Sequence, residues 1–195
     1  MLITVVVTSA VLLIFAAILP VLFLEDNDPQ NPPSFEFSDP ALSADPMSDT
    51  DYMQLDRAVY YRTLSGYEIT VSVAESDLSS VDAELALLWR LVHAAMTGDA
   101  DAYNACFSKE YIESSGKAED FTKQKLYDIT ITLYEGAEQS IPDGYASVRA
   151  YGLAYKIKDN NGSLRRDMGS DAIKEQLFFV VKDTSGNVTI YGMRS

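Results

Sequence analysis

Residues 93–107, HAAMTGDADAYNACF, decide how the folded part of the chain is organised. An apolar stripe at helical spacing leads into this stretch. Its members are Val81, Leu85, Leu88, Val92 and Ala95. Ser79, followed by Asp82, resembles a capping box at the start of a helix. Gly98 suits the left-handed position that ends a helix, and Asp99 suits the cap of the next one. The sequence therefore predicts a long helix, a corner at Gly98 and a second helix. The segment SKEYIESSG adds a further short turn, with Ser108 as its expected cap.

Strand patterns flank this helical corner on both sides. Tyr67–Val73 alternates apolar and polar residues. Residues 59–64 either pair with it as a hairpin or belong to a short helix over residues 51–64. Four further strand patterns follow Phe121, separated by turn residues. They occupy residues 126–134, 144–159, 172–183 and 187–193. Helices followed by strands predict an α+β fold in which helices pack on a curved antiparallel sheet.

Composition excludes one class of function. The chain has a formal net charge of −14, and residues 25–56 hold nine of its 29 acidic residues but none of its 15 basic ones. Nucleic-acid recognition draws its affinity from lysine and arginine, so nucleic acid is not an expected partner. Cys106 is the only cysteine, which excludes an intrachain disulfide and a cysteine-based metal cluster. Its place in the predicted second helix favours an inert interior position.

Residues 2–24, LITVVVTSAVLLIFAAILPVLFL, form an uncharged stretch of 23 residues. At about 1.5 Å per residue, a helix of this length crosses a bilayer core of roughly 30 Å. The alternative is a cleaved signal peptide, but the stretch is longer than such a leader needs, no basic residue precedes it and no A-x-A site follows. We expect a single-pass anchor in the cell membrane, with the lipid bilayer as its partner and the C-terminal domain outside the cytoplasm.

Residues 25–53 have the composition of an extended tether. Five prolines interrupt them and their acidic residues repel one another, so little apolar surface is available to offset the entropy of ordering. The segment PSFEFSDP, residues 33–40, is alternatively a short docking motif. The sequence thus divides into an anchor (residues 1–24), a disordered acidic tether (25–53) and a soluble α+β domain (54–195).

Few residues are suited to catalysis or to holding a metal. His93 is the only histidine and falls beside the apolar stripe, which favours a surface position. Asp99 and Asp101 are explained by capping and by the first turn of a helix. Asp128 and Glu175 lie in predicted strands and face either solvent or a pocket. The sequence contains no glycine-rich phosphate loop, no nucleophile motif and no pair of histidines. We therefore expect no catalytic residue, no metal and no cofactor.

Tyrosines are the candidate binding residues. Tyr145, Tyr151 and Tyr155 are separated by even numbers of positions on one predicted strand and so share one face of it. Tyr134 and Tyr191 lie on predicted neighbouring strands. Amphipathic rings of this kind often form the centre of a protein or ligand contact. The alternative is that they serve only as strand formers on a half-buried face.

The helical corner and the strands after it resemble a known superfamily. A long helix, a Gly-Asp break, a second helix, the segment Phe-Ser-Lys-Glu-Tyr and a run of antiparallel strands cover about residues 79–193. This order resembles the nuclear-transport-factor-2-like superfamily, a cystatin-like α+β cone, most specifically in MTGDADAYNACFSKEY. The resemblance implies a curved sheet around helices with a pocket at the open end. The family includes isomerases, dehydratases and cyclases as well as non-catalytic envelope proteins.

Together these features predict a membrane-anchored extracytoplasmic interaction domain without catalysis, in a bacterial envelope assembly. Its expected partner beyond the bilayer is an unknown protein or small ligand. The alternative function is a small isomerase or cyclase that uses an acid in the cone pocket. That alternative requires an ionisable side chain buried beside a hydrogen-bonding tyrosine.

Overall fold

The computed structural model describes residues 45–65, 67–135 and 140–194 of the chain. The predicted membrane anchor and the first part of the predicted tether, residues 25–44, lie outside these ranges. Within them, no helix combines the length and the apolar composition that crossing a bilayer requires. The architecture below is therefore that of the domain alone.

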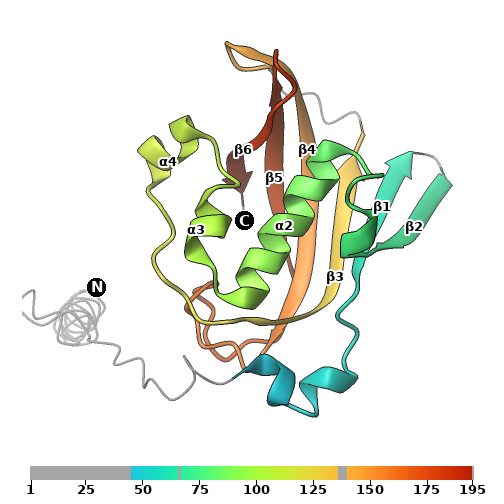
Figure 1. The fold of residues 1–195 in the computed structure, drawn as a ribbon, viewed down its shortest axis with the longest axis vertical. Coiled ribbons are helices and arrows are strands. Elements are labelled where there is room, and N and C mark those ends of the chain that lie inside the picture. The colour runs from blue at the N-terminus through green and yellow to red at the C-terminus, as the bar shows by residue number, and fades with distance from the viewer. Residues whose placement is uncertain (1–44, 66, 136–139, 195) are drawn as a thin grey trace, which may run out of the picture. The chain divides into compact units, whose positions relative to one another are not determined.

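Six strands form one open sheet in the order β2-β1-β3-β4-β5-β6 (Figure 1). They are β1 (Val59–Ser65), β2 (Tyr67–Val73), β3 (Lys125–Tyr134), β4 (Tyr145–Lys158), β5 (Lys174–Asp183) and β6 (Val188–Arg194). The hairpin between β1 and β2 is confirmed, and so is the α+β class. The prediction of an antiparallel sheet is wrong in one place: the sheet is mixed, because β1 and β3 run parallel while the other neighbours are antiparallel. The three helices lie between β2 and β3 in the chain, and this long connection brings β3 back beside β1 in the same direction.

The helical corner forms as predicted, with a later start. Helix α2 (Ala83–Thr97) begins at Asp82, whose side chain accepts a hydrogen bond from the backbone N–H of Glu84, so Ser79 lies before the cap. Gly98 ends α2 with a φ of 69°, and Asp99 caps α3 (Ala100–Asn104). A Cβ at Gly98 would lie 2.9 Å from the backbone nitrogen of Lys123. Both conformation and space therefore require glycine at this corner.

A third helix and the hydrophobic core complete the domain. Ser108 caps α4 (Lys109–Ser115), as the sequence predicts. The helices cover one face of the sheet (Figure 1), and a single apolar cluster lies between the two layers. Its fully buried members include Leu88, Leu91, Ile129, Ile131, Ile157, Phe178, Val180 and Ile190. Cys106 is buried in the same cluster, as expected of an inert interior thiol.

The end of the predicted tether is ordered and belongs to the domain. Two short 3-10 helices, η1 (Pro46–Ser48) and η2 (Tyr52–Gln54), precede β1. Tyr52 is buried, and its hydroxyl donates to the carbonyl oxygen of Leu126 at 2.9 Å. Asp49 accepts hydrogen bonds from Lys125 and Lys158 at 2.7 and 2.8 Å. The domain thus includes residues 45–53, because one aromatic ring and one carboxylate in an otherwise polar segment find partners on β3 and β4.

Candidate functional site

Two of the five predicted binding tyrosines lie in the interior. Tyr151 and Tyr155 are only 1% and 5% exposed, because strand alternation directs them toward the face that the helices cover. The hydroxyl of Tyr155 donates to Gln176 Oε1 at 3.1 Å, and burial raises the pKa of Tyr155 to about 12. Neither ring is available to a partner on the surface.

The other three tyrosines are partly exposed, and only two of them meet. Tyr145 and Tyr191 pack edge to face with ring centroids 5.5 Å apart. A register shift between Tyr145 and Ser147 breaks the alternation of β4 there. This bulge separates Tyr145 from the two buried tyrosines of the same strand. The hydroxyl of Tyr134 donates to Glu175 Oε1 at 2.6 Å, across Gly152. The five tyrosines thus form no common surface.

The remaining sequence candidates have structural roles. His93 is exposed and stacks on the ring of Trp89 with centroids 5.2 Å apart. Asp128 forms an ion pair with Lys156 at 2.9 Å. Among the described residues, no group of three or more histidine, cysteine, aspartate or glutamate side chains is placed to hold a metal.

The cavity that the described residues form under α2 offers little room for a ligand. The cavity under α2 has a volume of about 10 Å³, which is the space that one water molecule needs. Small-molecule pockets usually measure about 300–1,000 Å³. The lining is mainly apolar and includes Leu91, Val92, Leu126, Tyr155, Gln176 and Phe178.

A buried carboxylate lies at the start of α2. Glu84 is 3% exposed, and its Oε2 accepts hydrogen bonds from the Tyr151 hydroxyl at 2.8 Å and from Arg149 Nη1 at 2.9 Å. Arg149 reaches the surface, where it also pairs with Asp82 at 3.1 Å. Burial and the Glu84 carboxylate raise the pKa of Tyr151 far above its usual value, so the tyrosine stays a donor. This is the arrangement of acid and tyrosine that the enzyme alternative requires.

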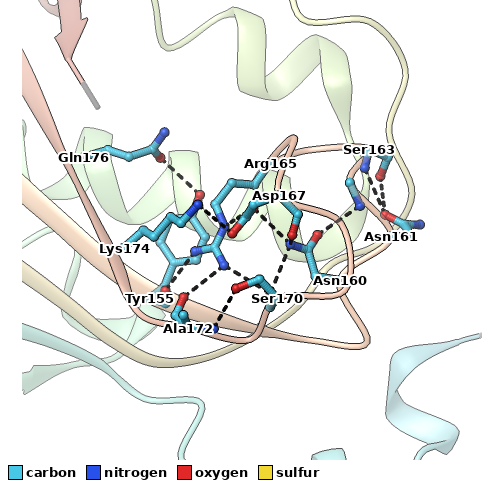
Figure 2. A network of polar contacts seen from close by, with 11 residues as sticks. Tyr155, Asn160, Asn161, Ser163, Arg165, Asp167, Ser170, Ala172, Lys174 and Gln176 are labelled. Atoms are coloured by element: carbon cyan, nitrogen blue, oxygen red, sulfur yellow. Dashed lines mark hydrogen bonds and ion pairs between the residues drawn. The ribbon is translucent and has the colours of Figure 1, made fainter. Parts of the chain in front are cut away.

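A second polar cluster fixes the connection between β4 and β5, as Figure 2 shows. The buried Arg165 donates to the carbonyl oxygens of Tyr155, Ser170 and Ala172 at 3.0–3.3 Å. Its Nε also donates to Asp167 Oδ1 at 2.7 Å. Burial alone would raise the pKa of Asp167, but its bonds from Lys174, Arg165 and Asn160 lower that pKa to about 2. Arg165 donates its hydrogen bonds to oxygen atoms of the loop and of Tyr155. The cluster therefore fixes the shape of the loop, and the guanidinium group is not available to bind a ligand.

The surface best suited to binding is on the hairpin of β1 and β2. We call it the hairpin shelf and define it by residues that share the helix-facing side of three strands. They are Tyr61, Thr63, Ile69, Val71 and Leu133. In register, Val71 lies beside Tyr61, and Tyr61 beside the fully buried Ile131. Ile69 and Val71 are nevertheless 57% and 47% exposed. The apolar rows of the core therefore continue as exposed side chains on the hairpin. The hairpin forms one margin of the sheet (Figure 1).

The sequence predicts the strand that carries the hairpin shelf, but it does not predict that the side chains of the shelf are exposed. Tyr67–Val73 shows strict alternation, which predicts a strand with one apolar face. The alternation does not reveal that α2 reaches only the Val73 end, where Trp89 Nε1 donates to the Val73 carbonyl at 3.3 Å. No protein-family model, curated protein or solved structure matches the chain. The candidate site therefore depends on geometry alone, and that geometry is an exposed apolar surface on the hairpin together with the buried carboxylate of Glu84.

Proposed function

We propose that this protein is a membrane-anchored interaction domain that contacts a protein partner through the hairpin shelf and performs no catalysis. The observation that carries the proposal is the exposure of Ile69 and Val71 beside buried rows of the core. Burying apolar surface is worth roughly 25 cal/mol per Å². A partner that covers these two side chains gains this energy at a preformed surface, without ordering a loop.

The filled interior supports a protein partner over a small ligand. A cavity of about 10 Å³ accepts a water molecule, whereas a metabolite needs a far larger space. The exposed apolar side chains lie on an outer strand of the sheet, where a partner's backbone has access to them.

The location of the domain follows from the chain before it. Residues 2–24 have the length and composition of a single membrane span, and residues 25–44 have those of an acidic tether. We place the domain outside the cytoplasm, held near the bilayer in an envelope assembly. The resemblance to the nuclear-transport-factor-2-like superfamily extends this proposal to a curved sheet wrapped around its helices.

Site-specific photocrosslinking in native membranes tests this function. A photoreactive amino acid at Val71 of the full chain is expected to yield a discrete protein adduct. The same group at Glu113, on the exposed side of α4, is the matched control and is expected to yield none. Equal adducts at both positions, or none at either, would count against the hairpin shelf as a binding surface.

A second candidate function rests on Glu84 and Tyr151. A buried carboxylate oriented by a tyrosine is suited to removing a proton from the carbon atom beside a carbonyl group and returning it. The small cavity and the ion pair with Arg149 oppose this function, because both limit access to the carboxylate. Deuterium uptake from heavy water into a panel of small ketones, followed by NMR, would detect such chemistry. Uptake with the natural chain and none with Glu84→Gln would establish it, and no uptake with either would remove it.

A further inference from the structure

We infer that the edge strand β2 pairs antiparallel with β2 of a second copy of this chain. The inference rests on the proposed function, because it names the partner of the hairpin shelf. It makes the contact a continuous sheet across two protomers rather than an interaction with a different protein. A two-fold axis perpendicular to the sheet passes midway between Thr70 of one copy and Thr70 of the other and relates the two strands.

The first argument is that β2 lacks the features that usually protect an edge strand. Edges are commonly blunted by lysine, proline, a bulge or a covering segment. The strand reads YEITVSV, with one acidic residue and no proline, lysine or arginine. It pairs with β1 over all seven residues without a register shift, and the described residues supply no strand beyond it.

The second argument is that the sequence of β2 is complementary to itself. With Thr70 facing Thr70 of the second copy, Ile69 lies opposite Val71 and Val71 opposite Ile69. In this register Glu68, the one charged residue in the sequence of β2, falls opposite position 72 of the second copy rather than opposite itself. Apolar pairs and the absence of facing like charges both stabilise cross-strand neighbours. This register centres the new pairing on Thr70, in the part of the strand that α2 leaves uncovered.

The third argument is the continuity of the apolar face. A two-fold axis perpendicular to the sheet keeps the helix-facing side of both copies on the same side. Ile69 and Val71 of each copy then cover the same residues of the other, and the shelf becomes a shared apolar strip. One edge ladder and four such side chains make a small interface, at the low end of the size for specific complexes. The association is therefore weak and depends on chain concentration in the membrane.

Cysteine crosslinking of the full chain in native membranes tests the register. Thr70→Cys places two thiols opposite each other, at the Cα separation of about 4.5–5.5 Å that a disulfide accepts. Ser72→Cys is the matched control, because it is on the same face of the same strand but lies opposite Glu68. Both natural residues are exposed, so both variants should fold. The natural Cys106 is buried, and burial raises its pKa to about 11, which keeps it out of the reaction.

Under mild oxidation, Thr70→Cys is expected to give at least about tenfold more disulfide-linked homodimer than Ser72→Cys. Adding Val71→Lys to Thr70→Cys should reduce that yield to the level of the control. Equal yields from the two single variants would overturn the inference, because they would indicate random collision. Folded Thr70→Cys that forms no homodimer would also overturn it. A Val71 photoadduct with a different protein would overturn the second copy as partner while leaving the hairpin shelf as a binding surface.

Discussion

The two outer strands of the sheet, β6 and β2, differ in what covers them. The segment between α3 and α4 runs along β6, where the Ser108 N–H donates to the Ile190 carbonyl at 2.8 Å. The Ile190 N–H in turn donates to the Cys106 carbonyl at 2.9 Å. Ile190 also belongs to the hydrophobic core and is 0% exposed, whereas Ile69 on β2 is the most exposed large apolar side chain described.

The comparison shows that, among the described residues, the chain covers the edge strand β6 with its own backbone and leaves most of β2 uncovered. Gly192 of β6 pairs with Phe179 and Ile190 pairs with Val180, so Tyr191 is an extra residue that makes a bulge on β6. The bulge and the backbone cover are both known protections against edge pairing. On β2 the side chain of Val73 is buried, whereas that of Val71, two positions earlier in the chain, is exposed. Among the described residues, β2 is therefore the edge that stays open for the pairing proposed above.

The largest expected effect comes from the same substitution at the two edges. Ile190→Ala removes a fully buried side chain and should lower the free energy of unfolding by about 3 kcal/mol. Ile69→Ala removes an exposed one and should cost less than about 0.5 kcal/mol. Urea unfolding of the two variants measures both values. Similar losses in dilute solution, where a weak pairing of two copies dissociates, would contradict the comparison, since they would mean that the chain itself covers Ile69.

Acid should weaken the covered side of the sheet through the loop between β4 and β5. Because hydrogen bonds lower the pKa of Asp167 from 3.8 to about 2, its carboxylate stabilises the fold fully above pH 4. This contribution is lost as the pH falls toward 2. Allowing for screening by solvent, we expect it to be about 1 to 2 kcal/mol.

Asp167→Asn isolates this contribution from that of the other carboxylates. The variant should be less stable than the natural chain at pH 6 and should approach it near pH 2. Ile69→Ala should instead differ from the natural chain by the same small amount at every pH, since the isoleucine side chain carries no titratable group. Unfolding in urea at pH 6, 4 and 2.5 provides the measurement. A constant difference between Asp167→Asn and the natural chain would contradict the assigned pKa.

Loosening the cover of β6 should make it behave more like β2. The Ser108 side chain accepts a hydrogen bond from the Tyr111 N–H at 3.2 Å and so fixes the start of α4. Ser108→Ala should cost about 1 kcal/mol, the usual price of a lost N-cap. Hydrogen exchange at the Ile190 amide should become faster. The exposed Ser114 is the control in the same helix, and Ser114→Ala should leave exchange at Ile190 unchanged.

What the sequence predicts well in this molecule is local. Gly98 and Asp99 make the corner, Ser108 caps the next helix, and the alternation of Tyr67–Val73 makes a hairpin strand. Each of these features depends on residues within a few positions of one another, so the chemistry that causes it is visible in a short stretch.

What the sequence does not predict depends on contacts between distant residues. Alternation places Tyr151 and Tyr155 on one face, but only the position of α2 decides that this face is buried. Tyr52 belongs to the domain because of a carbonyl 74 positions away, at Leu126. The exposure of the hairpin shelf is of the same kind, since it depends on where α2 ends its cover.

The smallest expected effect concerns the point at which that cover stops. The indole N–H of Trp89 donates to the Val73 carbonyl at 3.3 Å, which ties the end of β2 to α2. Trp89→Phe keeps an aromatic ring but removes the donor, so we expect a loss of about 0.5 to 1 kcal/mol. Hydrogen exchange should become faster at Val73 and should change little at Ile69, which α2 does not cover.

His93→Ala is the control for this substitution, because it removes the stacked neighbour of Trp89 and leaves the hydrogen bond in place. It should change exchange at Val73 far less than Trp89→Phe does. If Trp89→Phe instead speeds exchange equally along the whole of β2, then α2 holds the entire edge strand. Contacts with α2 would then stabilise β2 as far as Ile69, and the contrast between the two edge strands would disappear.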